Sequence, residues 1–199
     1  MPTAPRPLRP TLRFAPELLL AAQGPTGRLR AAIFDVDGVL TDGSVWISAE
    51  GETIKPFSVL DGHGLKLLAR GGIEPLIVTG RDSAAVRRRV ADLGLQHAVY
   101  GAGDKLAAAG ALLDRLGLDW SEVAAIGDDW PDLPLLLRAG FAACPPGAHA
   151  EVRAAVHHIT TAEGGRGAGR EFCDLLLMAA GRYAELLQGH LTTLDGTRP

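Results

Sequence analysis

Short apolar runs that alternate with amphipathic segments constrain the fold of this chain more than any other feature. Such runs occupy residues 31–34, 75–78, 97–100, 123–126 and 141–144. Their length and continuous apolar character suit strands that are buried on both faces of a parallel sheet. Between them, apolar residues recur at helical spacing over residues 83–93 and 105–116. The alternation predicts an α/β fold with a doubly wound parallel sheet of the Rossmann-like kind.

One segment departs from this alternation. Residues 44–57 hold two runs rich in β-branched and aromatic residues on either side of Glu50-Gly51. This pattern predicts a β-hairpin that projects as a flap just after the first strand. A short helix is expected next, over residues 64–70.

The length of 199 residues suits one domain rather than two. Residues 1–27 are predicted to form a flexible arm rich in proline and arginine, because the prolines within its first 16 residues oppose a helix. Residues 28–190 are the predicted folded domain. The polar residues 191–199 are predicted to form a flexible tail.

The composition argues against several classes of partner. A net charge of -3 and 5% aromatic residues do not favour general nucleic-acid binding, which needs a positive face. No run approaches the roughly 20 apolar residues of a membrane span, and no signal peptide is apparent. Cys144 and Cys173 are too few for a disulfide framework, and they favour reduced thiols in the cytoplasm. We therefore expect a cytoplasmic protein without nucleic-acid or membrane partners.

Residues able to do chemistry gather where the predicted strands end, which is the edge at which open parallel sheets bind ligands. Each piece alone has a simpler interpretation, such as a turn formed by Asp or a solvated Lys. Their joint position on one edge favours an active site. The successive groups are Asp35 with Asp37, then Thr79-Gly80-Arg81, then Lys105, then Asp128 with Asp129.

Carboxylates crowded at one edge repel one another unless a cation lies among them. Oxygen ligands without a Cys or His cluster favour Mg²⁺ rather than Zn²⁺ where phosphate is also bound. We expect Asp35 to attack phosphorus and form an aspartyl-phosphate. Asp37 would protonate the leaving oxygen and later deprotonate a water molecule. Lys105 and the Thr79 hydroxyl would hold the phosphate oxygens.

These residues resemble the four motifs of the haloacid dehalogenase superfamily. The motifs read Asp35-Val36-Asp37-Gly38-Val39-Leu40, Thr79-Gly80-Arg81, Lys105 and Gly127-Asp128-Asp129-x-x-Asp132. A closer resemblance, over about residues 29–180, is to the 3-deoxy-D-manno-octulosonate 8-phosphate phosphatase family. It rests on Ile54-Lys55-x-Phe57, Asp61-Gly62-x-Gly64, Asp104-Lys105-Leu106 and the segment that begins Gly164-Gly165-Arg166-Gly167.

The resemblance implies a Mg²⁺-dependent hydrolase that releases phosphate from a sugar-acid phosphate in lipopolysaccharide precursor synthesis. Asp35 and Asp128 would bind Mg²⁺ through their side chains, and Asp37 through its carbonyl oxygen. A turn histidine is an equally good interpretation of His63. The positions expected to contact the substrate are Asp37, Asp61, Gly62, His63, Gly80, Arg81, Arg89 and Lys105.

Many members of the superfamily carry a cap domain, but no cap domain fits here. The hairpin and the helix over residues 64–70 use up most of the chain between Asp37 and Thr79. By the same resemblance, the hairpin would associate with its copies in a homotetramer. Residues 164–167 would form a mobile tail that reaches a neighbouring active site. A solvent-exposed hairpin and a flexible linker are the simpler alternative.

Three other interpretations compete with this one. Leu60 stands where the family commonly has an arginine that contacts the sugar acid, so a nine-carbon sugar-acid 9-phosphate is an alternative substrate. A phospho-acceptor signalling module also combines acidic residues, a hydroxyl and a lysine, although in another order along the chain. A non-catalytic relative is disfavoured because this chain keeps all the catalytic residues.

Overall fold

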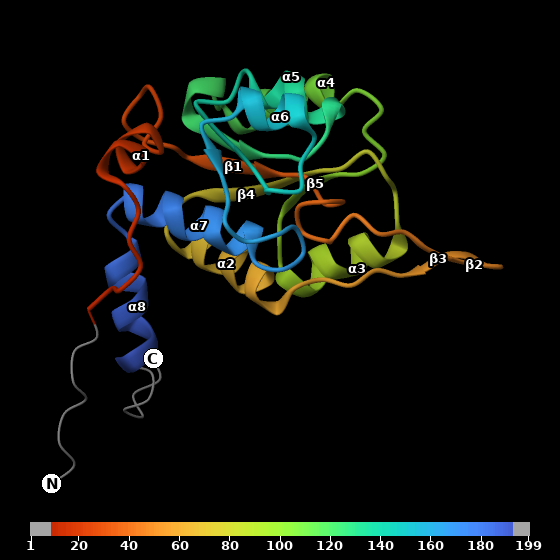
Figure 1. The fold of residues 1–199 in the computed structure, drawn as a ribbon, viewed down its shortest axis with the longest axis horizontal. Coiled ribbons are helices and arrows are strands. Elements are labelled where there is room, and N and C mark those ends of the chain that lie inside the picture. Colours follow the sequence, from red (N-terminus) through yellow and green to blue (C-terminus); the bar gives the residue numbers. More distant parts are fainter. Residues whose placement is uncertain (1–8, 193–199) are drawn as a thin grey trace, which may run out of the picture.

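Six parallel strands form the central sheet of the computed structural model, which describes residues 9–192 (Figure 1). Numbered along the chain, these strands have the spatial order 3-2-1-4-5-6, and the order reverses between β1 and β6. That reversal is the point where doubly wound sheets bind their ligands. In spatial order the strands are β5 (His97–Val99), β4 (Glu74–Val78), β1 (Ala31–Phe34), β6 (Val123–Ile126), β7 (Phe141–Cys144) and β8 (His158–Ile159).

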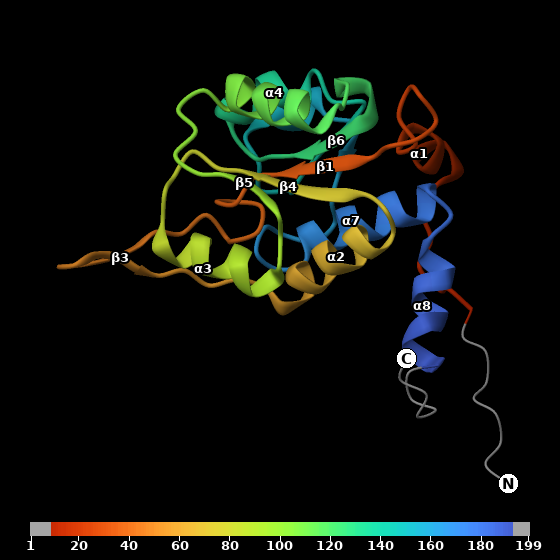
Figure 2. The same ribbon diagram turned by 180° about the vertical axis from the view of Figure 1, so that it is seen from behind.

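Helices cover both faces of the sheet (Figures 1 and 2). One face carries α2 (Val59–Arg70), α3 (Ala84–Leu93) and α7 (Ala168–Ala179), and the other carries α4 (Lys105–Leu116), α5 (Leu133–Leu136) and α6 (Ala150–Ala155). The remaining helices are α1 (Pro16–Ala21), α8 (Tyr183–Thr192) and the 3-10 turns Trp120–Glu122 and Trp130–Asp132. Within residues 9–192, none of these helices has the length and apolar character needed to cross a membrane.

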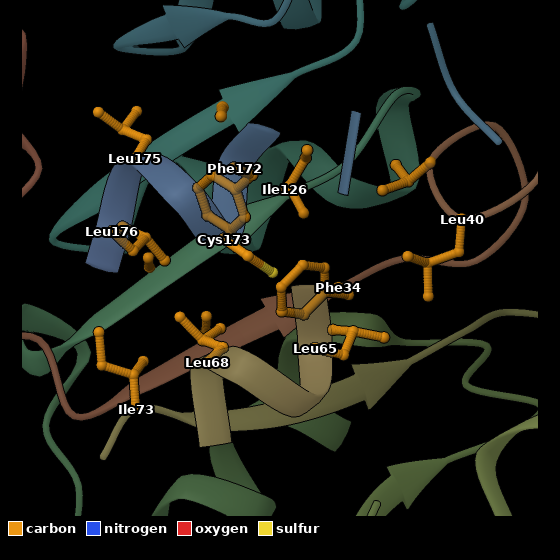
Figure 3. Packing of buried hydrophobic residues seen from close by; sticks show 14 of the residues in the cluster. Phe34, Leu40, Leu65, Leu68, Ile73, Ile126, Phe172, Cys173, Leu175 and Leu176 are labelled. Carbon is orange, nitrogen blue, oxygen red and sulfur yellow. The ribbon is translucent and has the colours of Figure 1, made fainter. Parts of the chain in front are cut away.

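Alternate residues of each central strand enter two separate cores. Phe34 of β1 packs with α2 and α7, whereas its neighbour Ile33 packs with α4 and α5. Figure 3 shows the first core, in which the Phe34 ring meets the Phe172 ring of α7 edge to face, with centroids 5.5 Å apart. Both faces of these strands are thus apolar, which is why the sequence reads as continuous apolar runs and not as alternating ones.

The predicted doubly wound sheet is confirmed, with helix boundaries that differ in one place. The helix expected over residues 64–70 begins at Val59, because the Ser58 hydroxyl caps it and accepts from the N–H groups of Leu60 and Asp61. Gly62 and Gly64 therefore lie inside α2, although glycine is a poor helix former.

The predicted hairpin is present and extends away from the body (Figures 1 and 2). It consists of β2 (Trp46–Ser48) and β3 (Gly51–Ile54), and its turn falls at residues 49–50, one position before the expected one. Gly51 opens β3 with a φ of 96°, a conformation that glycine adopts readily. Between β1 and β4 the chain forms only the hairpin and α2, and between β4 and α4 only α3 (Ala84–Leu93) and β5, so residues 9–192 hold no cap domain, as the sequence predicts.

Part of the arm that we predicted to be flexible over residues 1–27 is helical and packed in the structure, which describes the chain from residue 9. Residues 16–21 form α1, and Leu18 and Leu19 pack against the first core beside the buried Ala22. Pro16 is the first residue of α1, a position where its missing N–H costs nothing. Residues 1–8 of the arm and 193–199 of the predicted tail lie outside the described residues, and α8 includes residues 191–192.

Replacing Phe172 tests the first core. Phe172→Ala removes a fully buried ring that packs on both Phe34 and Phe141, and we expect it to lower the free energy of unfolding by about 3–5 kcal/mol. Urea denaturation measures the change. Leu20→Ala, at an exposed position, is the control and should stay within about 0.5 kcal/mol of the wild type. Equal effects of the two substitutions would contradict the packing described here.

Candidate active site

The loop after β1 brings two aspartates to the carboxyl edge of the sheet. Asp35 continues the strand, since its N–H donates to the Ile126 carbonyl of β6 at 3.1 Å. The chain then turns back, because the N–H groups of residues 39–41 all donate to the Val36 carbonyl. This tight turn places Asp37 on the same edge as Asp35.

Gly38 allows the loop to approach β6. Its φ is 83°, and a Cβ atom at this position would lie 2.0 Å from Oδ2 of Asp128. Any side chain here would therefore displace the Asp128 carboxylate. Glycine in the Asp-x-Asp-Gly sequence is needed for the contact between the first and the fourth motif.

Lys105 lies between two carboxylates. It is the first residue of α4, whose N-terminus is capped by the Asp104 side chain. Its Nζ is 2.7 Å from Oδ1 of Asp35 and 2.7 Å from Oδ1 of Asp132. Burial by itself would lower the pKa of the Lys105 ammonium, but the two carboxylates outweigh burial and raise that pKa. Lys105 is therefore a fixed positive charge at this edge.

Asp35, Asp128 and Asp132 form an acidic cluster. Each contributes a carboxylate oxygen, and these oxygens all lie within 4.8 Å of one another. Burial, followed by the negative charge of Asp132, raises the pKa of Asp35 to about 7 and that of Asp128 to about 6. The protein part of the site therefore carries more negative charge than Lys105 neutralises, as expected of a site for a hard cation.

Asp132 also organises the loop after β6. Its Oδ2 accepts hydrogen bonds from the N–H groups of Asp128 and Asp129 at 3.2 Å and 3.3 Å. It thus holds Asp128 in place while its other oxygen contacts Lys105. Asp129, which the sequence groups with Asp128, is exposed at the mouth of the site.

The residues after β4 complete one wall. Thr79 is buried, and its hydroxyl oxygen accepts from the N–H of Arg81 at 3.4 Å. The resulting cleft has a volume of about 450 Å³. The structure thereby brings together seven of the predicted site residues in that cleft, namely Asp35, Asp37, Thr79, Gly80, Arg81, Lys105 and Asp128.

Comparisons with known proteins agree with this geometry. Residues 45–140 match the family model of haloacid dehalogenase-like hydrolases. The 3-deoxy-D-manno-octulosonate 8-phosphate phosphatase KdsC of Escherichia coli strain K12 is 40% identical over 157 residues, which is 79% of this chain and 84% of that protein. This chain belongs to the 3-deoxy-D-manno-octulosonate 8-phosphate phosphatase family. The resemblance inferred from the motifs is confirmed.

Solved structures of the family have the same fold. The enzyme from Moraxella catarrhalis, in complex with magnesium, phosphate and KDO, is 40% identical with a TM-score of 0.82 over 87% of this chain and 98% of that one. The cobalt-bound enzyme from Haemophilus influenzae is 38% identical, with a TM-score of 0.78 over 81% and 97% of the two chains.

The acidic cluster suits the metal site of a phosphatase of this family. The three carboxylates are buried or half-buried, and they offer only oxygen ligands, the set that Mg²⁺ prefers. Asp35 and Asp128 are the side chains available to a cation, because both oxygens of Asp132 already have partners in Lys105 and the 128–129 backbone.

Four residues predicted to contact the substrate do not line the cleft of the acidic cluster in a single chain: Asp61, Gly62, Arg89 and His63. Asp61 is buried and accepts from the N–H groups of Gly167 and Arg170, so it holds the start of α7. A Cβ on Gly62 would lie 2.3 Å from Nη2 of Arg89, so Gly62 makes room for that guanidinium. Arg89 in turn donates to the Ser58 carbonyl at 3.1 Å. Contacts of these residues with substrate stay predictions.

His63 lines another cavity, of about 170 Å³, together with Leu67, Arg170 and residues of α8. Its ring meets that of His190 edge to face, with centroids 5.4 Å apart. Burial lowers the pKa of His63, and the nearby positive charge of Arg170 adds to this effect. In a single chain, His63 is thus a partner of α8, and a role in substrate binding stays a prediction.

Residues 164–167 are packed, in contrast to the mobile tail that we expected. The Gly165 N–H donates to the Val39 carbonyl at 2.9 Å. A Cβ on Gly164 would lie 1.9 Å from the Gly38 carbonyl oxygen. The glycines here allow two backbones to touch and do not make the segment loose. This segment supports the loop that carries Asp37.

Sequence reasoning quoted Asp132 and Lys55 as motif residues without giving either a role, and it missed Glu52. Asp132 belongs to the fourth motif, but its contact with Lys105 was not anticipated. Lys55 pairs with Asp37 across 18 positions of the chain, and Glu52 pairs with Lys55 and Arg81. Asp132 and Lys55 both stand in motifs that the sequence offers, so those motifs could have assigned them to the site, whereas no motif or spacing points to Glu52.

The raised pKa values predict a pH-dependent effect of Mg²⁺ on stability. In the folded protein, Asp35 and Asp128 keep their protons up to a higher pH than in the unfolded chain. The loss of folding stability that their ionisation causes is therefore absent below about pH 4 and complete above about pH 7. Mg²⁺ at about 100 times its Kd should add about 2.7 kcal/mol, or about 5–10 °C in Tm. We expect this increase at about pH 7.5 and a much smaller one at about pH 5, where protons compete.

The Tm of the wild type is measured by thermal melting in Mg²⁺ and in EDTA, and Asp128→Asn is the control. The variant should lose the Mg²⁺-dependent increase in Tm. In EDTA at about pH 7.5 it should melt at or above the wild type, because one unpaired carboxylate is gone. A Tm increase that is equal at both pH values, or that persists in the variant, would contradict the assignment.

Proposed function

We propose that this protein is a Mg²⁺-dependent phosphatase that hydrolyses 3-deoxy-D-manno-octulosonate 8-phosphate to the sugar acid and phosphate, a step in making a lipopolysaccharide precursor. The observation that carries the proposal is the cleft at the carboxyl edge of the sheet, where Asp35, Asp37, Lys105 and Asp128 converge. The relatives that are 40% identical over most of both chains bear this activity in their names.

The first step is attack by Asp35 on phosphorus. One Asp35 oxygen forms a bond to phosphorus while the bond from phosphorus to the sugar oxygen breaks, and Asp37 donates a proton to that oxygen. Lys105 and the Thr79 hydroxyl hold the phosphoryl oxygens. A magnesium ion held by Asp35 and Asp128 would supply positive charge that lets the phosphate dianion approach the carboxylates.

The second step is hydrolysis of the aspartyl-phosphate. Water attacks phosphorus, its proton passes to the Asp37 carboxylate, and the bond between Asp35 and phosphorus breaks. Both residues then return to their starting states, so turnover continues. A phospho-acceptor signalling module would instead stop after one phosphorylation, and Asp37 beside the phosphorylated residue argues against that alternative.

Asp35→Asn tests the nucleophile. Asparagine has nearly the same shape but cannot form the covalent intermediate, so we expect phosphate release to fall by about 10⁴-fold or more. Circular dichroism should show an unchanged fold, because the substitution removes a buried carboxylate whose charge is costly. Phosphate release above about one-tenth of the wild-type rate would rule out Asp35 as the nucleophile.

A panel of substrates tests the identity of the sugar. Phosphate release is measured from 3-deoxy-D-manno-octulosonate 8-phosphate, a nine-carbon sugar-acid 9-phosphate and glucose 6-phosphate, each with Mg²⁺ or EDTA. We expect the highest kcat/KM for the first and no turnover in EDTA. Preference for the nine-carbon compound would favour the alternative that Leu60 keeps open, because leucine offers no charge to a carboxylate.

We also propose that the hairpin joins copies of this chain in a homotetramer in the cytoplasm, where the two buried cysteines would remain free thiols. Trp46, Ile47 and Ile54 are exposed on the hairpin, at 59%, 76% and 63%. An isolated two-stranded hairpin is only marginally stable in water, and an apolar one invites pairing. A partner on this surface would stabilise it.

Light scattering tests the assembly. We expect a mass close to four times the 20.8 kDa of one chain. Ile47→Glu should shift the protein toward smaller species, because it places a charge in the proposed contact. Leu137→Glu, at another exposed apolar position, is the matched control and should leave the mass unchanged. A monomer at micromolar concentration of the wild type would refute the proposed assembly.

A further inference from the structure

A closed ring of four charged side chains lies beside the acidic cluster. Lys55 pairs with Oδ1 of Asp37, and its Nζ is 3.2 Å from Oε1 of Glu52. Oε2 of Glu52 is 2.6 Å from Nη2 of Arg81, whose Nε is 3.7 Å from Oδ2 of Asp37. Each charge thus has an opposite charge on either side. Two of the four residues come from the hairpin: Glu52 lies in β3 and Lys55 follows it.

Lys55 is fixed within this ring. Only 1% of its side chain is exposed, and Glu52 is 9% exposed, so neither charge is free to move into water. A buried ammonium is costly unless it is paired, and truncation of one partner leaves the other charge uncompensated. The ammonium group of Lys55 is therefore held by its ion pairs with Asp37 and Glu52. By contrast, Lys66 on α2 is exposed.

The two carboxylate oxygens of Asp37 have different surroundings. Oδ1 is bound by Lys55 and lies 3.5 Å from the Thr41 hydroxyl. Oδ2 is buried and has no hydrogen-bond partner among residues 9–192, with Arg81 just beyond hydrogen-bond distance. A carboxyl group held by one oxygen presents the other in a defined direction, both when that other oxygen carries a proton and after it has given the proton up. Oδ2 therefore has an ion-pair neighbour in Arg81 but no hydrogen bond, and it belongs to the residue that lines the cleft next to Asp35.

We propose that Lys55, held in turn by Glu52, is a positioning residue that fixes Oδ1 of Asp37 so that Oδ2 exchanges the proton with the leaving oxygen and then with water. This inference rests on the proposed phosphatase function. In the first step the proton moves from Oδ2 to the sugar oxygen as its bond to phosphorus breaks. In the second step the attacking water returns a proton to Oδ2, so Lys55 neither gains nor loses one.

A double-mutant cycle on the sugar-acid phosphate tests this role. Lys55→Met should lower kcat/KM by about 10–100-fold, the usual cost of losing a supporting partner of a reactive group. In the Asp37→Asn background the same substitution should cost less than about 2-fold, because Lys55 acts through Asp37. Lys66→Met is the matched control and should leave kcat/KM unchanged. Equal losses from Lys55→Met in both backgrounds would overturn the proposal.

The leaving group provides a second measurement. Phenyl phosphate needs a proton on its leaving oxygen more than p-nitrophenyl phosphate does, and the two substrates are otherwise alike. Lys55→Met should lower kcat/KM for phenyl phosphate about 10-fold more than for p-nitrophenyl phosphate, and Lys55→Arg should restore part of the difference. A merely structural role would lower both rates equally, and that result would overturn the proposal.

Two further outcomes are informative. If Lys55→Met does not fold, as judged by its Tm, Glu52→Gln takes its place, and it should change the ratio of the two rates in the same direction. An unchanged ratio in a folded Glu52→Gln variant would then overturn the proposal. Failure of the wild type to turn over the sugar-acid phosphate with Mg²⁺ would instead refute the proposed function, so the two failures are distinguishable.

Discussion

The burial of like charges just beyond the carboxyl ends of β1 and β6 is the constraint on which the rest of this structure depends. Asp35, Asp128 and Asp132 lie within a few ångströms, and Lys105 offsets only part of their charge. Such an arrangement is unfavourable for the protein alone, as the raised pKa values of Asp35 and Asp128 indicate. A cation and a phosphate group bound in the cleft would offset this cost, so the folded protein gives up stability at this point in exchange for binding.

The fold keeps two neighbouring carboxylates in separate surroundings. Asp35 faces Lys105 on α4, whereas Asp37 faces Lys55 beside the hairpin, although only one residue lies between them. The turn around the Val36 carbonyl separates them, and Gly38 lets that turn reach Asp128. Two carboxyl groups in different environments can take different roles, one as nucleophile and the other as proton carrier.

The strands and the acidic motifs could be predicted because their signals are local. Strands β1, β6 and β7 are buried on both faces, and their continuous runs of apolar residues predict this burial. Helix α1 was missed because the density of prolines before Pro16 hid a short helix that gains its stability from packing on α7. The support of α7 by Asp61, the pairing of Lys55 with Asp37 and the packing of Gly164 on Gly38 all join residues far apart in sequence. No periodicity or spacing encodes such contacts.

The contact of residues 164–165 with residues 38–41 also sets the order in which the loop around Asp37 can be completed. A ribosome builds the chain from its N-terminus, so Asp35 and Asp37 emerge more than 120 residues before the glycines against which their loop packs. A nascent chain that has formed β1, β4 and β6 still lacks this backbone support. The loop at the start of the domain therefore takes its final shape only when nearly the whole domain has been synthesised.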